Sequence, residues 1–321
     1  MIHYVLVRKY ASQASVLWAS CALALFAFAW VRVWVTSLLD LGQFSTILEQ
    51  FRDFERFAPV PFDVLFTQTG RVGMTFDEPL VILCVIVWAI SRGSDVVSGE
   101  LGRGTLEMIL AQAISRTTLL LSNAFVSIAG LIGLVLVLWA GIAAGIATTT
   151  VTETVPPPSI RIPFTAIEFP LTNDAPEKVS FPMSDEVQWE SFASGVFSLF
   201  AFGFFVLALA TLLSSLDRYR WRTIGVVLAI YILQFVIYGL GKAAERLDWL
   251  QAFSFFNLYR PQKQISMVTA NGPWAPWRWT GGDYESWFGP MVYPLILIVG
   301  GIAFYAAAVV IFRRRDLPAP L

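Results

Sequence analysis

The longest uncharged run in the sequence covers residues 117–152 and consists mainly of Leu, Val, Ile, Ala and Gly. A helix needs about 20 predominantly apolar residues to cross the hydrocarbon core of a bilayer, so this run is long enough to span one. The whole chain of 321 residues is 56% hydrophobic and 14% charged, with a mean hydropathy of +0.65. Soluble domains carry roughly a quarter charged residues. The sequence therefore predicts an integral membrane protein.

Shorter uncharged runs of the same kind recur along the chain. We expect six membrane-spanning helices and an all-α polytopic membrane protein, with the spans at residues 10–31, 79–97, 119–147, 192–215, 224–241 and 290–312. The second span is unusual because its uncharged part covers only residues 79–91, so the helix must continue past Arg92 and Asp95. These two side chains either snorkel at the membrane edge or pair inside the bundle; an ion-translocating site is the less favoured alternative.

Between the spans lie three long polar segments, and we expect one six-span transmembrane domain that covers residues 1–321. We expect loops at residues 37–78, with a short helix near 41–57, and at residues 242–288, with a helix near 243–256. The insertion at residues 148–190 is rich in proline, which favours strands or a disordered loop over long helices. Residues 1–13 are either an interfacial helix or a simple tail. The tryptophans of the last loop (Trp274, Trp277, Trp279 and Trp287) predict an aromatic belt at the membrane interface, or alternatively a surface for a sugar or a lipid headgroup.

Basic residues set the expected orientation. The turn between the fourth and fifth spans contains Arg218, Arg220 and Arg222 against Asp217 alone, and Arg313 to Arg315 follow the sixth span. By the positive-inside rule these segments are cytoplasmic. We therefore expect a multi-pass protein of the cell (inner or cytoplasmic) membrane with both termini in the cytoplasm and the three long loops outside. The first span, which follows Arg8 and Lys9, is predicted to be a retained anchor.

Composition argues against several classes of function. A net charge of −1 disfavours a nucleic-acid partner. The only histidine is His3, and Cys21 and Cys84 lie in separate apolar runs as small buried hydrophobes, so we expect no catalytic centre, no metal site and no cofactor. The spans carry no mid-membrane acids of the kind that ion-coupled transporters use. Gly141 and Gly145 have the spacing that lets two helices approach closely.

The segment at residues 98–116 interrupts the apolar pattern with charges. Glu100, Arg103 and Glu107 fall at i, i+3 and i+7, which places them on one face of a helix. Leu106, Ile109, Leu110 and Ala113 form an apolar stripe on another face. The pattern predicts one amphipathic helix over residues 100–115. Gly102 and Gly104 weaken such a helix by up to about 1 kcal/mol each, so we expect an external surface to hold it, either a partner protein or the bilayer surface.

This segment also carries a family resemblance. Ser98-Gly99-Glu100, Gly104-Thr105-Leu106-Glu107, Ile109-Leu110-Ala111 and Ile114-Ser115-Arg116 occur in the order and register of ABC-2-type transporter permeases, the membrane subunits of ATP-driven exporters. The chain departs from the pattern at Ala113, where many members have proline, and at Asn123, where many have lysine. The order of long and short loops is similar to the ABC-2 plan across nearly the whole chain, apart from the larger insertion at residues 148–190.

The resemblance implies that the segment is a cytoplasmic coupling helix between the second and third spans that docks on a separate ATP-binding ABC subunit. The sequence itself has no GxxxxGK[ST] motif with which to hold ATP. The expected docking residues are Glu100, Arg103, Gly104, Thr105, Leu106, Glu107, Leu110, Ser115 and Arg116, with Leu106 and Leu110 facing the membrane body. Expected partners are the ATPase subunit, a second copy of the chain or a paralogous permease, and membrane lipids.

Two functions are compatible with these patterns. The first is export of a substrate that the sequence does not identify, driven by ATP hydrolysed in the partner subunit. The second is a permease-like subunit that does not transport and instead transmits ATPase motion to an external domain or partner, an alternative that the large insertion at residues 148–190 keeps open.

Overall fold

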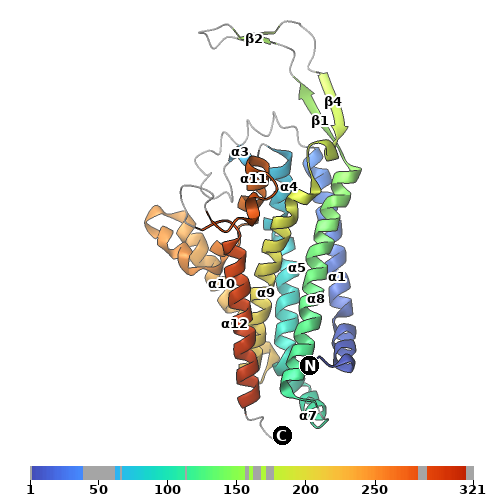
Figure 1. Ribbon diagram of the computed structural model, residues 1–321, viewed down its shortest axis with the longest axis vertical. Coiled ribbons are helices and arrows are strands. Elements are labelled where there is room, and N and C mark those ends of the chain that lie inside the picture. The colour runs from blue at the N-terminus through green and yellow to red at the C-terminus, as the bar shows by residue number, and fades with distance from the viewer. Residues whose placement is uncertain are drawn as a thin grey trace.

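The computed structural model describes residues 2–38, 62–65, 67–112, 114–155, 159–161, 168–170, 177–280 and 288–315. Within them it contains six helical segments that are long and apolar enough to cross a membrane. They run side by side as one bundle (Figure 1). Their helices are α1 (Tyr4–Ser37), α5 (Pro79–Ser94), α8 (Arg116–Thr148), α9 (Ala193–Leu216), α10 (Arg220–Ala243) and α12 (Val292–Arg314). The prediction of an all-α protein with six spans is confirmed.

Shorter elements join these helices. The helical ones are α3 (Phe62–Leu65), α4 (Gln68–Gly73), η2 (Met74–Asp77), η3 (Asp95–Gly99), α6 (Glu100–Gly102), α7 (Thr105–Leu110), η4 (Met183–Asp185), η5 (Trp189–Phe192), η6 (Glu245–Phe253), η7 (Phe255–Leu258), α11 (Pro261–Asn271) and η8 (Ala275–Trp277). The strands are β1 (Thr150–Val155), β2 (Ser159–Arg161), β3 (Glu168–Pro170) and β4 (Glu177–Pro182). The helix expected near residues 41–57 lies outside the described residues.

The centre of the bundle is formed by α5 and α9. Each of these two helices belongs to a membrane-spanning segment whose most apolar stretch has 67% of its residues buried inside the protein. The corresponding value for α10 is 11%. α9 packs between α5 and α12, and α8 packs along α1. Gly141 and Gly145 permit this second contact, because an added Cβ would lie 2.8 Å from the Phe26 carbonyl oxygen and 2.7 Å from the Val33 Cβ. The predicted packing role of this glycine pair is confirmed.

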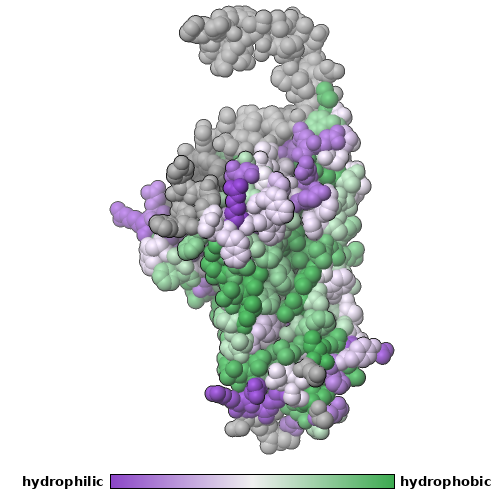
Figure 2. Space-filling model, viewed as in Figure 1, coloured by the Kyte–Doolittle hydropathy of each residue, from purple (hydrophilic) through white to green (hydrophobic). Residues whose placement is uncertain are grey.

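An apolar surface covers the middle of the bundle, and polar residues gather towards both of its ends (Figure 2). The band follows from the exposed apolar side chains of the outer helices, such as Leu23, Val299 and Ile302. In water such a surface would be unfavourable by roughly 25 cal/mol for each Å² of apolar area. A bilayer removes that cost, so the outer face of the bundle matches a membrane environment.

The first helix differs from its prediction. α1 is continuous from Tyr4 to Ser37, so residues 4–13 are neither a separate interfacial helix nor a tail. Tyr10 is fully buried and Leu6 is 4% exposed, which shows that this part of α1 belongs to the bundle. Both cysteines are free thiols: Cys21 on α1 is buried, as predicted, whereas Cys84 on α5 is only partly buried. Their side chains lie close enough for a hydrogen bond.

The insertion after α8 contains antiparallel strands, as the sequence suggested. β1 pairs with β4 in a register that joins Thr150 to Pro182 and Val155 to Glu177, and β2 pairs with β3. The hairpin rises from the end of the bundle opposite α7 (Figure 1). After α10 the helical segment predicted near residues 243–256 is present as the 3₁₀ helices η6 and η7. An α-helix, α11, follows; Pro261 begins it, where its missing N–H costs nothing, and Gly272 ends it at φ 88°.

Candidate functional site

The chain between α5 and α8 forms a contact region rich in ion pairs at one end of the bundle. We call residues 95–116 the connector. The predicted single helix over residues 100–115 is wrong. Gly104 has φ 69°, a left-handed conformation that favours glycine, so α6 ends at Gly102 and α7 starts at Thr105. Glu100, Arg103 and Glu107 therefore do not share one helical face. Glu100 stays with the end of the second span, and Glu107 belongs to a separate helix.

The second span enters the connector through a π-helical turn, η3. Such turns loosen the regular hydrogen-bond ladder of a helix and occur frequently at functional sites. Ser214 on α9 compensates here: its hydroxyl oxygen accepts hydrogen bonds from the N–H of Val97 (3.2 Å) and of Ser98 (3.0 Å). The same hydroxyl is 3.0 Å from the Ser94 carbonyl oxygen, to which it donates. The Thr223 hydroxyl on α10 adds a contact of 3.2 Å to the Ser98 hydroxyl.

Glu100 is the buried acid of the connector. Its side chain is 0% exposed, and the Lys9 ammonium on α1 lies 2.8 Å from its Oε1. Arg103 approaches the same carboxylate at 3.3 Å, and the Thr105 hydroxyl donates a short hydrogen bond to it. Because an unpaired buried charge is strongly unfavourable, these three partners determine where the start of α7 lies.

Asp95 is the second acid of the connector, and three arginines form ion pairs with it. Arg103 on the connector contacts it at 2.7 Å, Arg220 on α10 at 3.3 Å and Arg92 on α5 at 3.9 Å. The hydrogen bond that Arg103 donates to Asp95 raises the pKa of Arg103, so this guanidinium is always charged. Arg92 and Asp95 are only 3% and 4% exposed. Of the sequence-based alternatives, pairing inside the bundle is therefore the one that the structure shows.

The two acids are linked through Arg103, which contacts both. The resulting ion-pair cluster consists of two acids and four cations: Asp95, Glu100, Lys9, Arg92, Arg103 and Arg220. It joins α1, α5 and α10 to the connector. Sequence analysis identified Arg92 and Asp95 as a pair but missed Lys9 and Arg220, since nothing local in the sequence shows that α1 and α10 approach the connector.

α7 rests on the bundle through an apolar face. Leu106 is fully buried and Ile109 is 9% exposed, in a cluster with Leu6 and Tyr10 of α1, and Leu110 packs against the edge of this cluster. The opposite side of α7 points away from the bundle: Met108 is 70% exposed, and Glu107 is half-buried with no ion pair among the described residues. A 6-residue helix is too short to be stable alone, so these contacts hold it.

The last residues of the connector are used to start α8. Ser115 is the N-cap, and its hydroxyl oxygen accepts a hydrogen bond from the Thr118 N–H at 3.1 Å. Arg116 lies away from the ion-pair cluster and donates to the Phe312 carbonyl oxygen at 3.0 Å, at the end of α12. Arg315 likewise donates to the Ser215 carbonyl oxygen at the end of α9, at 2.8 Å. Both arginines bind helix carboxyl ends, where cations are favoured.

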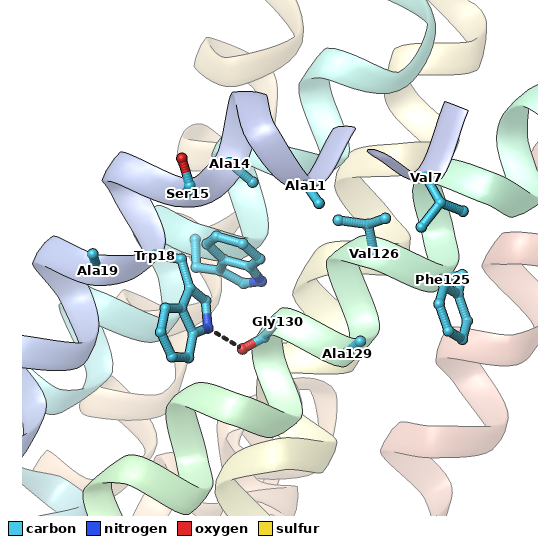
Figure 3. Close-up of a pocket in the computed structure, with 11 residues that line it drawn as sticks. Val7, Ala11, Ala14, Ser15, Trp18, Ala19, Phe125, Val126, Ala129 and Gly130 are labelled. Carbon is cyan, nitrogen blue, oxygen red and sulfur yellow. Dashed lines mark hydrogen bonds between the residues drawn. The ribbon is translucent and has the colours of Figure 1, made fainter. Parts of the chain in front are cut away.

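An apolar groove lies between α1 and α8, beside the connector end of the bundle (Figure 3). It has a volume of about 560 Å³. The Trp18 indole donates a hydrogen bond to the Gly130 carbonyl oxygen at 2.9 Å, and the Trp88 indole donates to the Ser127 carbonyl oxygen at 3.0 Å. The groove offers apolar contact and no reactive side chain. Among the described residues no group of three or more His, Cys, Asp and Glu side chains could hold a metal ion.

Comparison with known proteins agrees with this architecture. The family model described as ABC-2 family transporter protein matches residues 15–317. The match includes all of the connector and most of the length of the six spans. A search of curated proteins gives no match. Because the family model covers nearly the whole chain, the protein belongs to the ABC-2 family of ABC transporter permeases.

Proposed function

We propose that this chain is the membrane subunit of an ATP-driven exporter and that α7 with the adjoining turn at Arg103 docks on a separate ATP-binding subunit. The observation that carries the proposal is the construction of the connector. A short helix turns an exposed side, with Met108, away from the bundle, and its Thr105 binds Glu100 just before the turn. The ion pairs of Glu100, Asp95 and Arg103 in turn join this part of the connector to α1, α5 and α10. A push on α7 is therefore transmitted to three membrane helices at once.

The docking residues proposed from the structure differ in part from those expected from sequence. Arg103, Met108 and Glu107 reach the surface and are the proposed contacts. Glu100, Thr105, Leu106 and Leu110 are turned towards the bundle, and in the proposal they position α7 for its partner. Gly104 supplies the turn that separates the two groups.

The proposed orientation places the connector in the cytoplasm. Arg103, Arg116, Arg218, Arg222, Arg313 and Arg314 all belong to the connector end of the bundle, where α12 ends and α1 begins (Figure 1). An excess of cations supports a cytoplasmic position by the positive-inside rule. In this orientation both termini are cytoplasmic, the β1–β4 hairpin is external, and the protein lies in the cell membrane.

A complete transporter also requires a second transmembrane subunit in the proposal, either another copy of this chain or a related permease. The outer face of α10 supports this part of the proposal, because Ile232, Leu233 and Phe235 are each 58% exposed. Lipid and a second subunit can share this apolar face.

The test is co-purification from the native membrane in mild detergent. Tagged wild-type chain should bring down a subunit that peptide mass spectrometry identifies by its GxxxxGK[ST] motif, with measurable ATPase activity. Glu107→Arg should lose the subunit while the permease keeps its elution profile. Glu190→Arg, the same charge reversal at an exposed position of η5 at the other end of the bundle, is the matched control and should retain the subunit. Absence of an ATPase from every preparation contradicts the proposal.

A second function is favoured by one feature, the continuity of α8 with the hairpin. α8 starts beside the connector at Arg116, ends at Thr148 and leads into β1, and the Met183 N–H after β4 donates to the Thr149 carbonyl oxygen at 3.1 Å. Motion at the connector could thus reach the hairpin without transport of a substrate. Replacing residues 152–180 with a short Gly-Ser linker separates the two functions: an exporter should keep ATPase activity that responds to substrate, whereas a motion-transmitting subunit should lose its effect on an external partner.

A further inference from the structure

A polar cavity lies at the end of the bundle opposite the connector. Its volume is about 210 Å³, and it is enclosed by the end of α10, the turns η6 and η7, η2 and the first turn of α11. α10 has 24 residues and therefore extends about 36 Å, somewhat more than the roughly 30 Å of a hydrocarbon core. Arg220 at one end of α10 belongs to the connector cluster, so Lys242 at the other end lies at the opposite membrane interface. The cavity is at the depth of lipid headgroups.

The cavity contains an excess of cations. Lys242, Arg260 and Lys263 line it, against the single acid Asp77. Arg260 is held in place, since its Nε donates to the Asn257 carbonyl oxygen at 2.7 Å and its guanidinium lies 4.6 Å from the centre of the Tyr293 ring. Lys242 lies beside Asp77 and partly offsets its charge. Arg260 and Lys263 therefore provide a net positive field in the cavity.

The first turn of α11 adds donors to this field. Pro261, Gln262 and Lys263 all line the cavity, so the amino end of an 11-residue helix faces it. The first N–H groups of a helix have no acceptor within the helix, and the helix dipole favours an anion at this end. A bound anion is therefore favoured by both the side chains and the backbone.

Two neighbouring buried side chains of the cavity, Asp77 and Gln262, interact with each other but keep polar atoms without a well-formed hydrogen bond. Gln262 is 1% exposed, and neither its amide nitrogen nor its amide oxygen makes a hydrogen bond within the described structure. The Oδ2 atom of Asp77 is also buried there without a hydrogen bond. Buried polar groups of this kind are ordinarily satisfied by protein, water or a ligand. The cavity thus offers an anion site together with a nearby hydrogen-bond acceptor.

We propose that this cavity binds a phosphate ester that carries a neighbouring hydrogen-bond donor, such as an ethanolamine headgroup. The phosphate oxygens lie against Arg260, Lys263 and the amino end of α11. These supply a guanidinium, an ammonium group and backbone N–H groups as hydrogen-bond donors. The ammonium group is directed to Asp77 Oδ2, and Gln262 supplies one donor and one acceptor between them. The site is independent of ATPase docking, because it lies at the other end of the bundle.

The test uses purified full-length chain in detergent and three probes: short-chain phosphatidylethanolamine, phosphatidylcholine with the same tails, and water-soluble phosphoethanolamine. The dissociation constant of each probe is measured, together with its effect on the thermal unfolding midpoint. Phosphatidylethanolamine should bind and raise the midpoint. Phosphatidylcholine, whose headgroup has no N–H donor, should bind at least about tenfold more weakly, because one charge-assisted hydrogen bond is lost. Comparable binding of phosphoethanolamine identifies a free phosphate ester as the source; its failure identifies a lipid.

Variants connect the binding to the cavity. Lys263→Gln should weaken phosphatidylethanolamine binding at least about tenfold through loss of a charged donor. Arg246→Gln removes an exposed cation from η6 outside the cavity and is the matched control, with unchanged binding. Gln262→Leu should leave the unfolding midpoint equal or higher without ligand, yet abolish the rise caused by phosphatidylethanolamine. Equal effects of Lys263→Gln and Arg246→Gln, or no binding of any probe, overturn the site. Equal binding of the two lipids overturns the role given to Asp77.

Discussion

Lys9 and Glu100 form an ion pair of 2.8 Å between the first span and the connector, and the Glu100 side chain is completely buried while that of Lys9 is 31% exposed. Removal of either partner should therefore have a different effect on stability. Removing the buried acid leaves Lys9 without its counter-charge and Arg103 with Asp95 alone. Removing the half-exposed lysine leaves Glu100 with Arg103 and Thr105.

This asymmetry gives the first prediction. Glu100→Ala should lower the free energy of unfolding by about 3 kcal/mol, the cost of breaking a buried pair from its buried side. Lys9→Met should lower it by only about 1 kcal/mol, because Lys9 is partly exposed and Glu100 keeps Arg103 and Thr105 as partners. Chemical denaturation followed by tryptophan fluorescence in detergent measures both. Equal losses for the two variants would show that Glu100 does not depend on the other partners seen in the structure.

Gly104 supplies a second prediction. Gly104→Ala should destabilise the connector by about 1 to 2 kcal/mol, because a Cβ at φ 69° is strained even where nothing crowds it. Gly102→Ala is the matched control: it lies in α6 with open space around it, and should be neutral or slightly stabilising. Hydrogen exchange over residues 98–116 reports the local effect. Identical protection in the two variants argues against the left-handed turn.

The hydroxyl of Ser214 should support the π-helical turn. Ser214→Ala leaves the N–H groups of Val97 and Ser98 without their acceptor, at a cost of about 1 to 3 kcal/mol for a buried group that loses its hydrogen bond. Ser20→Ala on the exposed side of α1 removes only a local bond to the Val16 carbonyl oxygen and should change stability very little. Thermal unfolding midpoints of both variants make the comparison, and a Ser214 variant as stable as the Ser20 variant would contradict this account of η3.

Gly130 should be required for packing of Trp88. A Cβ there would lie 2.1 Å from the indole ring, and overpacking of this kind costs about 1 to 3 kcal/mol. Gly225→Ala on α10 meets no atom within 4 Å and should stabilise its helix by up to about 1 kcal/mol. Gly130→Ala should therefore lower the unfolding midpoint, and Gly225→Ala should raise it. A destabilised Gly225→Ala would indicate that another subunit packs on α10 in the preparation.

The bundle and the connector differ in how far they could be predicted from sequence. The spans follow from uncharged runs, and even the extension of the second span past Arg92 follows from the length of a bilayer. The interior of the connector does not, because its helical periodicity continues through Gly104 in the sequence while one left-handed residue ends the helix. The partners of Asp95 and Glu100 come from α1 and α10, and only the packing of distant helices brings Lys9 and Arg220 to them.

The same limit applies at the other end of the bundle. The sequence showed proline-rich and tryptophan-rich loops there but not the cavity, because Asp77 and Gln262 come together only when α11 packs on η2. Local patterns predicted which segments leave the membrane. They could not predict which polar side chains those segments would bury.

Site-specific photo-crosslinking at position 108 tests the docking role of α7 most directly. A photoreactive side chain replaces Met108, which is 70% exposed, and a second preparation carries it at Val299, which is 65% exposed on the apolar face of α12. Irradiation of intact membranes should join position 108, and not position 299, to a polypeptide with a GxxxxGK[ST] motif. Crosslinking of position 108 to lipid alone would show that α7 lies on the bilayer surface and would contradict the docking account.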